Sequence, residues 1–356
     1  MERIYRHNIF IISLIVSLAL SILIFGSDVE ASLVQLRSAS LEVLLLAPLA
    51  LGIEICLRGI RLQVMTTIWQ KQIGFWRAIQ INLAGDFANA VTPASIGGGP
   101  VRGYQLVRSK MTIEEATATI IGERLTDHLA LVVLSVVLLL LSYDSFEGAG
   151  RYLVYMGGVS LIGCAACYVY FRSNSKFRQG TTGQYLAALF GKMIGTDSLP
   201  GRYAQRFIQF WGRLRHDLRH MVTLGGKRFL FCGVLAILNQ SVRTCIPVIL
   251  AYALHLDVPV TACVLWILAK RYGLDSMPIP GANGITEAAF LWFFGRYTAA
   301  SLLGPFLILW RFFSYYVYLI LGGAVTVWMV GDRAAGLKSY LTSIGNDQNP
   351  VVEESV

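Results

Sequence analysis

Charged side chains interrupt several of the most apolar stretches of this chain, and their spacing suggests specific chemistry. Glu123 and Asp127 lie four residues apart in the stretch ERLTDHLALVVL, so on a helix both carboxylates face the same side. Carboxylates this close repel each other unless a cation or a proton lies between them. Three uses of the pair are therefore open: a salt bridge to Arg102 or another arginine, a proton- or ion-coupling site, or the acid and base of a catalytic reaction.

Two glycine- and proline-rich breaks carry the other notable pattern. They read TPASIGGGPVR at 92–102 and IPGANGITEAA at 279–289. Both contain Pro-x-x-x-Gly followed by a charged residue: Pro93, Gly97 and Arg102 in the first, Pro280, Gly284 and Glu287 in the second. Because they lie in opposite halves of the chain, the two breaks are typical of an internally repeated transporter whose binding site lies between the repeats.

The first break has the composition of an anion-binding site. Gly97, Gly98 and Gly99 allow the backbone to come close to a ligand, and Pro100 suits the first turn of a restarting helix. The free N–H groups of that turn attract an anion, and Arg102 follows one turn later. A phosphate headgroup is the obvious anion inside a membrane.

Other charges in apolar stretches need partners. Glu287, one turn into the second break, needs a cation, for which Arg311 and Lys270 are the candidates. Glu54 and Arg58 lie four residues apart near the cytoplasmic end of their stretch, and we interpret them as a structural pair.

Polar side chains also gather at helical spacing. Asn82, Asp86 and Asn89 share one face of the segment before the first break, where they could face a polar cavity or make packing hydrogen bonds. The second half carries further polar residues in apolar stretches: Asn239, Gln240, Arg243, Lys270, Arg271 and Asp275.

The composition places these residues in a membrane protein. Of the 356 residues, 55% are hydrophobic and 14% are charged, and the mean hydropathy is +0.58; a soluble domain carries about 25% charged residues. A charge at the centre of a span costs about 2.5–3.5 kcal/mol on insertion scales, so each one needs a partner or a function. We predict an all-α polytopic integral membrane protein with about six full spans, at 9–26, 42–65, 115–142, 152–172, 228–254 and 303–331.

The basic residues follow the topology. The 30 Lys and Arg outnumber the 21 Asp and Glu, but the excess lies in alternate loops, with ten basic residues in 173–228 alone. This pattern predicts that the N-terminus, this loop and the C-terminal tail lie in the cytoplasm, and it argues against nucleic-acid binding. We expect residues 9–26 to remain as an uncleaved first span.

The orientation of the spans determines how the broken segments run. If 66–77 and 111–114 both lie in the cytoplasm, 78–110 must enter and leave the membrane on the same side, and 259–300 must do so from the opposite side. We therefore predict two oppositely entering re-entrant helix pairs in an inverted-repeat-like arrangement, with their breaks facing the interior.

The domain organisation follows from this arrangement. We expect one transmembrane domain over 1–335, made of a first half at 1–172, a basic connector at 173–227 and a second half at 228–335. Residues 336–356 form a cytoplasmic tail that we expect to be disordered at its end. Within the connector, 202–221 predicts an amphipathic helix, suited either to an anionic lipid surface or to packing on the domain.

In order, the motifs NAVTPASIGGGPVRGYQLVR, ERLTDHLAL and PIPGANGITEAA, followed by Arg311 in LILWRFFSYYVYLILGG, resemble the flippase-like membrane protein family. That family comprises the transmembrane region of lysylphosphatidylglycerol synthases and many stand-alone membrane proteins, and the resemblance runs from about residue 40 to 331. It implies paired re-entrant segments that move a polar lipid between leaflets. By position it marks Asn89, Pro93, Gly97, Arg102, Glu123, Asp127, Pro280, Gly284, Glu287 and Arg311.

One position departs from the family pattern. Many members carry an acidic residue where Gly99 stands, so we expect a headgroup that is not strongly cationic. The chain as given also ends soon after the last span, so we expect no aminoacyl-transferring activity.

The leading hypothesis is a lipid translocase of the cytoplasmic membrane that moves or binds an anionic-headgroup phospholipid or a polyprenyl-linked lipid, with no cofactor and no metal. Arg102, Arg311 and the breaks would contact the headgroup, while Asp86, Glu123, Asp127 and Glu287 would balance charge or bind a coupling proton. Two alternatives stay open: a non-transporting membrane partner of a lipid-synthesis enzyme or glycosyltransferase, and an intramembrane transferase that modifies lipids.

Overall fold

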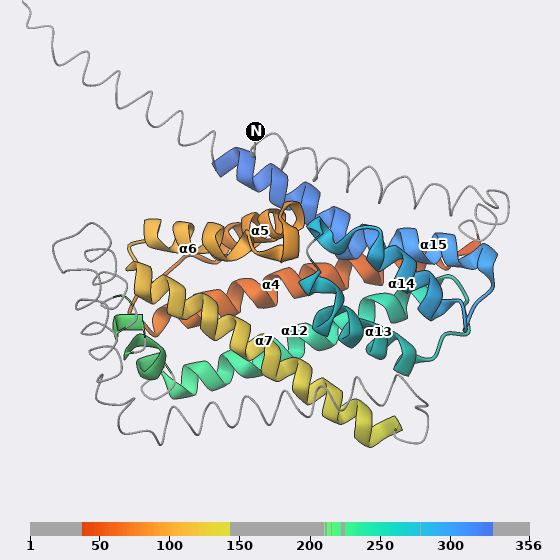
Figure 1. Ribbon diagram of the computed structural model, residues 1–356, viewed down its shortest axis with the longest axis horizontal. Helices are drawn as coiled ribbons and strands as arrows, with labels where there is room; N and C mark the ends of the chain where they lie inside the picture. The colour runs from red at the N-terminus through yellow and green to blue at the C-terminus, as the bar shows by residue number, and fades with distance from the viewer. Residues whose placement is uncertain are drawn as a thin grey trace, which may run out of the picture.

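The computed structural model describes residues 38–142, 210–221 without 211 and 215, and 225–329 without 278. The described residues are helical, with no strand among them (Figure 1). The first half holds α3 (Leu41–Leu44), α4 (Leu46–Thr67), α5 (Phe75–Val91), η1 (Pro93–Ser95), α6 (Gly98–Arg108) and α7 (Ile113–Ser142). The second half holds α12 (Gly226–Ala253), α13 (Val260–Tyr272), η3 (Leu274–Ser276), η4 (Pro280–Ala282), α14 (Ile285–Phe294), α15 (Ala300–Arg311) and the π-helix η5 (Phe312–Tyr316).

Two long helices form the centre of the bundle. α4 and α12 lie antiparallel: the N–H of Ser40 donates to the carbonyl of Ala253, 2.9 Å away, at one end. At the other end, a guanidinium nitrogen of Arg228 donates to the carbonyl of Thr67 at 2.8 Å. These contacts fix the two ends of the bundle, against which the shorter helices can be placed.

α5 and α6 form a helical hairpin whose open end lies beside Thr67. The chain leaves the helix at Thr92, whose extended backbone (φ −115°, ψ 144°) is the conformation favoured before a proline. Near the open end, Arg77 donates to the side chain of Gln105 at 3.0 Å. Near the tip, the N–H of Gly98 donates to the side chain of Asn89 at 2.8 Å.

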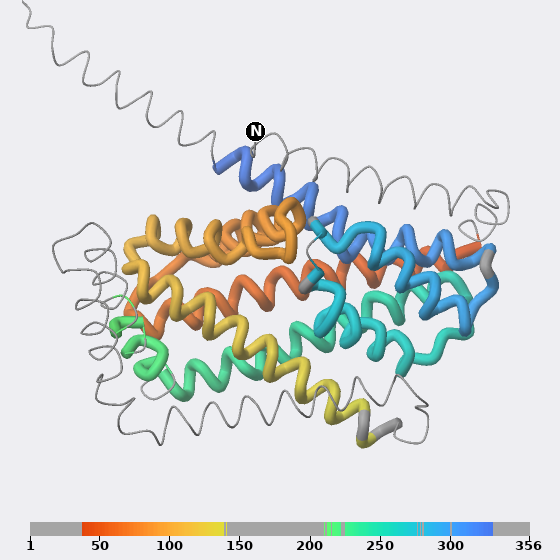
Figure 2. The backbone as a smooth tube through the Cα atoms, in the orientation of Figure 1, coloured from red at the N-terminus to blue at the C-terminus, as the bar shows by residue number. Residues whose placement is uncertain are grey.

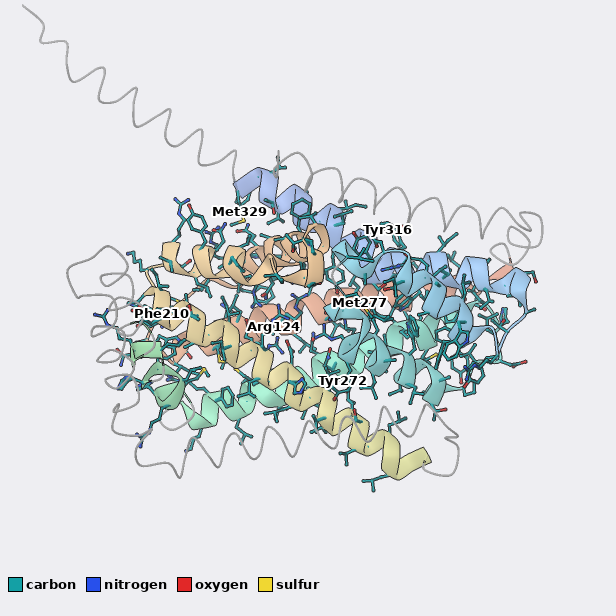
Figure 3. All side chains as sticks on the ribbon, viewed as in Figure 1. Arg124, Phe210, Tyr272, Met277, Tyr316 and Met329 are labelled. Atoms are coloured by element: carbon teal, nitrogen blue, oxygen red, sulfur yellow. The ribbon has the colours of Figure 1, made fainter. Side chains whose placement is uncertain are left out.

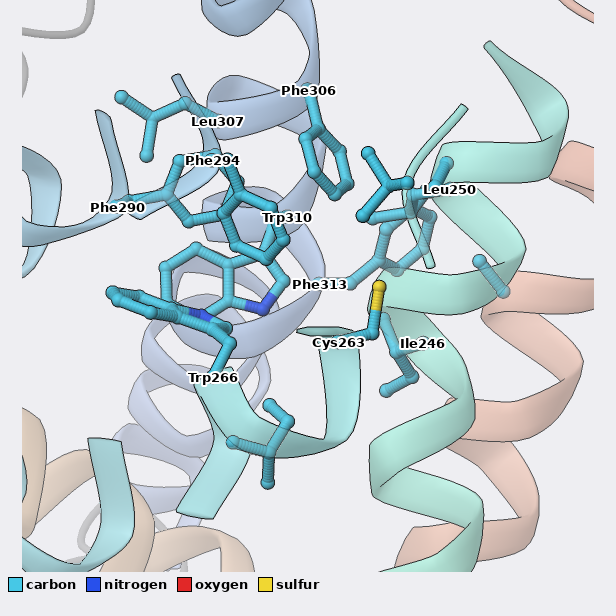
Figure 4. Packing of buried hydrophobic residues seen from close by; sticks show 14 of the residues in the cluster. Ile246, Leu250, Cys263, Trp266, Phe290, Phe294, Phe306, Leu307, Trp310 and Phe313 are labelled. Carbon is cyan, nitrogen blue, oxygen red and sulfur yellow. The ribbon is translucent and has the colours of Figure 1, made fainter. Parts of the chain in front are cut away.

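α13 and α14 form a second hairpin that starts from the Ala253 end. An apolar cluster joins its two helices: the Trp266 ring lies 5.3 Å from Phe290 and 5.7 Å from Phe294, and 5.4 Å from Trp310 of α15 (Figure 4). All four side chains are buried. Within a membrane such a cluster is stabilised by van der Waals packing rather than by removal from water, and it packs the second hairpin against α15.

The two hairpins therefore enter the bundle from opposite ends, and Figure 2 shows them converging at its middle. Each half has the same order of elements: a long helix (α4 or α12), a hairpin, and a further helix (α7 or α15). This supports the inverted-repeat-like arrangement. Whether each hairpin enters and leaves a bilayer on one side stays a prediction, as do the domain boundaries.

Among the residues that the structure describes, three helices are long and apolar enough to cross a membrane: Leu41–Thr67, Gly226–Ala253 and Ser301–Met329. They match the predicted spans at 42–65, 228–254 and 303–331. The span predicted at 115–142 coincides with α7, while those predicted at 9–26 and 152–172 lie outside the described residues. The total number of spans and the orientation of the termini stay predictions.

α4 shows which side of a helix faces outward. Leu46, Leu49 and Ile53 share one face and are 44–58% exposed, whereas Glu54 and Arg61 are 0% and 3% exposed. An apolar outer face with charges inside suits contact with lipid rather than water.

The last helix reaches both hairpins. After α15 it continues through η5 to Met329, and a Cβ at Gly322 would lie only 2.3 Å from the carbonyl oxygen of Leu83 on α5. The glycine thus permits a close crossing of the first hairpin, while Trp310 packs on the second.

The described part of the predicted amphipathic helix packs on the protein. Leu214 and Met221 are buried in the cluster that includes Leu62 and Met65 of α4, and His220 stacks on Trp69 with ring centroids 5.6 Å apart. Of the two uses expected for this segment, packing on the domain is the one observed over 210–221.

Candidate functional site

The tips of the two hairpins touch at the middle of the bundle. The N–H of Ala94 donates to the carbonyl oxygen of Met277, 3.2 Å away. The two broken segments thus share one location, although they are far apart in sequence. In the view of Figure 3, Met277 and Arg124 of α7 both lie near the middle of the bundle.

The two tips also share an unusual backbone. Ala94 and Ser95, which follow Pro93, both have a φ of 52°. In the second tip Gly281 and Ala282, which follow a proline, have φ values of 62° and 49°. Each left-handed L-residue costs roughly 1–2 kcal/mol, and such strain clusters at functional sites. The similarity between the two halves therefore includes the left-handed backbone that follows the proline of each break.

Tyr315 joins the two tips, and sequence reasoning missed it. Its hydroxyl accepts a hydrogen bond from the amide of Asn283 at 3.2 Å and donates to the carbonyl of Ala90 at 3.3 Å. A Cβ at Gly281 would lie 2.5 Å from the Tyr315 ring, so only glycine fits there. The sequence feature that could have indicated Tyr315 is its position one turn after Arg311. The π-helix that orients Tyr315 is of a kind that is common at functional sites.

Arg61 lies between Glu123 and Asp127, the two carboxylates predicted to need a cation or a proton between them. One guanidinium nitrogen donates to Asp127 at 3.1 Å with a second, shorter bond beside it, and Nε lies 3.7 Å from a Glu123 oxygen. Arg102 also binds Glu123 directly, across Gly85, where a Cβ would lie 2.5 Å from the Arg102 side chain. Of the three uses left open, the salt bridge is the one seen; Arg61 was not anticipated.

The second half contains a matching buried pair. Glu287 binds Arg311 at 2.7 Å, and both side chains are 1% exposed. Glu287 also accepts the N–H of Gly284 at 2.6 Å, which caps α14. Of the two expected partners, Arg311 is the observed one, because Lys270 binds Asp275 at 2.6 Å instead.

The acidic and basic members of these two ion pairs occupy reversed positions in the two halves. In the first half the hairpin carries the arginine, Arg102, and the following helix carries Glu123. In the second half the hairpin carries Glu287 and the following helix carries Arg311. Each hairpin is thus tied to the helix after it by one buried ion pair, a contact whose energy depends on close geometry.

The expected free N–H groups of the first break are already used. Gly97 donates to the Thr92 hydroxyl at 2.9 Å, and Gly98 donates to Asn89 at 2.8 Å. The prediction of an anion site on these two N–H groups is therefore wrong, because side chains of the preceding helix cap them first. Gly99 faces open space, with no atom within 4 Å of a Cβ placed there.

Asp86 and Glu54 extend the charged interior. Asp86 accepts a hydrogen bond from Arg58 at 2.7 Å, while Glu54 lies 3.7 Å from Arg58 and 3.8 Å from Arg243. The predicted Glu54–Arg58 pair is present, but Asp86 is the closer partner of Arg58. At those distances Glu54 gains Coulomb attraction without a hydrogen bond, and both its oxygens are buried and lack a donor.

The middle of the bundle carries more positive than negative charge. Arg124 of α7 is exposed and interacts electrostatically with Arg102 and Arg271. Eight cationic side chains of the described residues gather here against six carboxylates: Arg58, Arg61, Arg102, Arg124, Arg243, Lys270, Arg271 and Arg311 against Glu54, Asp86, Glu123, Asp127, Asp275 and Glu287. Over the described ranges no three His, Cys, Asp or Glu side chains are grouped to hold a metal ion.

The fold and the charged centre define a helical integral membrane protein built from two hairpin-containing halves. The chain belongs to the family described as the lysylphosphatidylglycerol synthase TM region, whose family model matches residues 10–322. The resemblance seen in the motifs is thereby confirmed.

Two archaeal proteins are similar to the chain. A UPF0104 membrane protein of Archaeoglobus fulgidus is 22% identical over 339 residues, which cover 93% of this chain and 100% of that protein. A UPF0104 membrane protein of Methanothermobacter thermautotrophicus is 32% identical over 146 residues, which cover 39% of this chain and 42% of that protein. The first similarity spans both hairpins.

Proposed function

We propose that the protein moves a lipid with an anionic headgroup between the two leaflets of a membrane. The observation that carries this proposal is the contact between two strained hairpin tips, Ala94 to Met277, within a charged centre. Family membership supports a lipid as the ligand, because the family is described as the membrane region of a lipid synthase.

Buried polar atoms around the tips favour a polar ligand. Arg61 Nε, Arg102 Nε, Asn82 Nδ2 and Gln240 Nε2 are buried without a hydrogen-bond partner. A buried donor without a partner costs about 1–3 kcal/mol, and native proteins keep few of them. A headgroup with several oxygens would satisfy such donors as it passes, and the excess of positive charge favours an anionic one.

The outer surface supplies the path for the acyl chains. α4 presents Leu46, Leu49 and Ile53 outward, so chains can stay in the hydrocarbon while the headgroup crosses through the centre. The hairpin tips are joined by a few neutral hydrogen bonds, each worth only about 0.5–1.5 kcal/mol. We expect separation of the tips to open the centre first to one side and then to the other.

The alternative from another class is a non-transporting membrane partner of a lipid synthase. It is favoured by the family description, which names a region of a synthase. The two candidates differ in what the purified protein does alone: a translocase moves lipid in protein-only vesicles, whereas a partner protein moves none.

The test is lipid movement in reconstituted vesicles. Fluorescent phosphatidylglycerol is placed in both leaflets, and the fraction accessible to an external quencher is followed with time. We expect wild-type vesicles to expose the inner-leaflet lipid faster than protein-free vesicles. The double variant Arg102→Gln with Glu123→Gln removes both members of a buried pair, so it avoids the cost of leaving one charge unpaired, and we expect it to slow movement at least tenfold.

Two results would contradict the proposal. Wild-type vesicles that expose no more lipid than empty ones would exclude translocation of this lipid, and parallel vesicles with phosphatidic acid extend the test to a second anionic headgroup. Unchanged movement in the folded double variant would remove Arg102 and Glu123 from the path. Circular dichroism and the melting temperature in detergent establish that the variant is folded.

A further inference from the structure

A cavity lies beside the hairpin tips, between α12, α13 and the last helix. Its lining includes Arg243, Lys270, Arg271, Trp310, Ser314 and Tyr318. Roughly 390 Å³ between these side chains is not filled by atoms, and this space includes a part that is open to solvent. The enclosed part is close to the size of one water molecule, so a larger polar group fits only as the side chains around it move apart.

The lining is electropositive. Lys270 and Arg271 share one carboxylate, Asp275, at 2.6 and 3.3 Å. Arg243 has only the distant Glu54, at 3.8 Å, which also attracts Arg58. Three cations therefore face the cavity with little more than one carboxylate among them. In an apolar surrounding such a surplus attracts an anion more strongly than it would in water.

Three donors in this lining have no partner in the protein. The Tyr318 hydroxyl, the Ser314 hydroxyl and Arg271 Nε are buried without a hydrogen bond, and Tyr318 is only 5% exposed. The Tyr318 ring is held in place by the Arg243 guanidinium, whose carbon lies 5.9 Å from the ring centre. Donors kept unpaired at a cost of about 1–3 kcal/mol each are typical of a site that awaits an acceptor.

We infer that this cavity binds a phosphate group, with Arg243, Lys270 and Arg271 supplying charge and Tyr318 and Ser314 supplying hydroxyl donors. A phosphate presents several strong acceptor oxygens, which matches a set made of donors alone. The inference deepens the proposed function and rests on it only for the source of the phosphate. The phosphate belongs to a lipid headgroup if the protein moves lipids, and it is a free anion if the protein does not.

The hydroxyls allow a test that leaves folding intact. Because neither hydroxyl bonds to the protein, Tyr318→Phe and Ser314→Ala remove no internal hydrogen bond, and we expect melting temperatures equal to or above that of the wild type. The loss of a hydrogen bond to a charged ligand weakens binding by roughly tenfold or more. Binding and stability are therefore expected to change separately.

The experiment titrates purified protein in neutral detergent with two phosphate sources, dioleoylphosphatidic acid and inorganic phosphate. Dioleoylglycerol, which has the same chains without phosphate, is the control ligand. We expect at least one phosphate source to bind, dioleoylglycerol not to bind, and both variants to raise Kd roughly tenfold. Binding of the lipid alone identifies a headgroup site, and binding of inorganic phosphate identifies a site for the free anion.

The matched control is Tyr252→Phe, which removes a hydroxyl from an exposed tyrosine of the same helix as Arg243, and we expect its Kd to equal that of the wild type. The inference is overturned if neither phosphate source binds, or if Tyr318→Phe and Ser314→Ala bind as the wild type does.

Failure of this inference can be told from failure of the proposed function. If wild-type vesicles move lipid while the Tyr318 variant binds phosphate normally, the translocase stands and this site is wrong. If phosphate binding depends on Tyr318 while vesicles show no lipid movement, the site stands and the translocase is wrong.

Discussion

The backbone N–H of Ala94 and the carbonyl oxygen of Met277 lie 3.2 Å apart and join two hairpins that start from opposite ends of the bundle. Through this bond and through Tyr315, which contacts Ala90 and Asn283, the two halves meet where the backbone of both tips is left-handed. The proposed transport cycle requires this contact to open and close, which leads to the first prediction.

A covalent link between the tips should stop lipid movement. A backbone hydrogen bond places the two Cα atoms near the disulfide range of about 4.4–6.8 Å, so Ala94→Cys with Met277→Cys should cross-link on oxidation. The background lacks the six native cysteines. We expect oxidised vesicles to lose movement and reductant to restore it, with each single cysteine variant unaffected by oxidant. Normal movement in fully cross-linked protein would show that the tips do not separate.

Gly281 should tolerate no side chain. Its φ is 62°, and a Cβ would lie 2.5 Å from Tyr315, so Gly281→Ala adds backbone strain of roughly 1–2 kcal/mol to a steric clash. We expect a lower melting temperature in detergent. Gly99→Ala is the matched control in the other break, because Gly99 faces open space, and we expect its melting temperature to stay within a degree or two of the wild type. Equal effects at both positions would contradict the geometry of the second tip.

Glu287 and Arg311 should behave as one unit. Glu287→Gln or Arg311→Gln leaves an unpaired buried charge and should cost about 3–5 kcal/mol of unfolding free energy. The double variant should cost much less than the sum of the two, because no charge remains unpaired. Unfolding titrations of all four proteins in mixed micelles measure this coupling. Additive losses would mean that the 2.7 Å contact contributes nothing specific.

Gly99→Glu should change headgroup preference. The position lies in the first turn of α6, where a carboxylate is favoured by the helix dipole, and it has open space around it. We expect the variant to fold and to move phosphatidylglycerol several-fold more slowly relative to a lipid with a cationic headgroup, measured in paired vesicle assays. The same ratio in both proteins would remove Gly99 from the headgroup path.

Much of the architecture was predictable from the sequence because it depends on local properties. Helix length and apolar composition predicted the spans at 42–65, 228–254 and 303–331, and proline with glycine predicted both breaks. The four-residue spacing of Glu123 and Asp127 predicted that a cation or a proton must lie between them. The partner of Glu287 was predicted to be Arg311 or Lys270, and Arg311 is the one observed.

The identity of most partners depended on tertiary structure. Arg61 lies on α4 and meets Asp127 on α7 only because the helices cross there, and nothing in either local stretch indicates that crossing. The free N–H groups expected at Gly97 and Gly98 are capped by Thr92 and Asn89, since the hairpin folds the preceding helix back onto them.

Sequence alone therefore determined that this is a helical membrane protein with two broken, charge-bearing segments, because hydrophobicity and backbone preference act over a few residues. Only the tertiary structure decided that the breaks touch, that Tyr315 joins them, and that Tyr318 and Ser314 face one cavity with three cations. Partners that are far apart in the chain are determined in three dimensions, since hydrogen bonds require close geometry and Coulomb attraction weakens with distance.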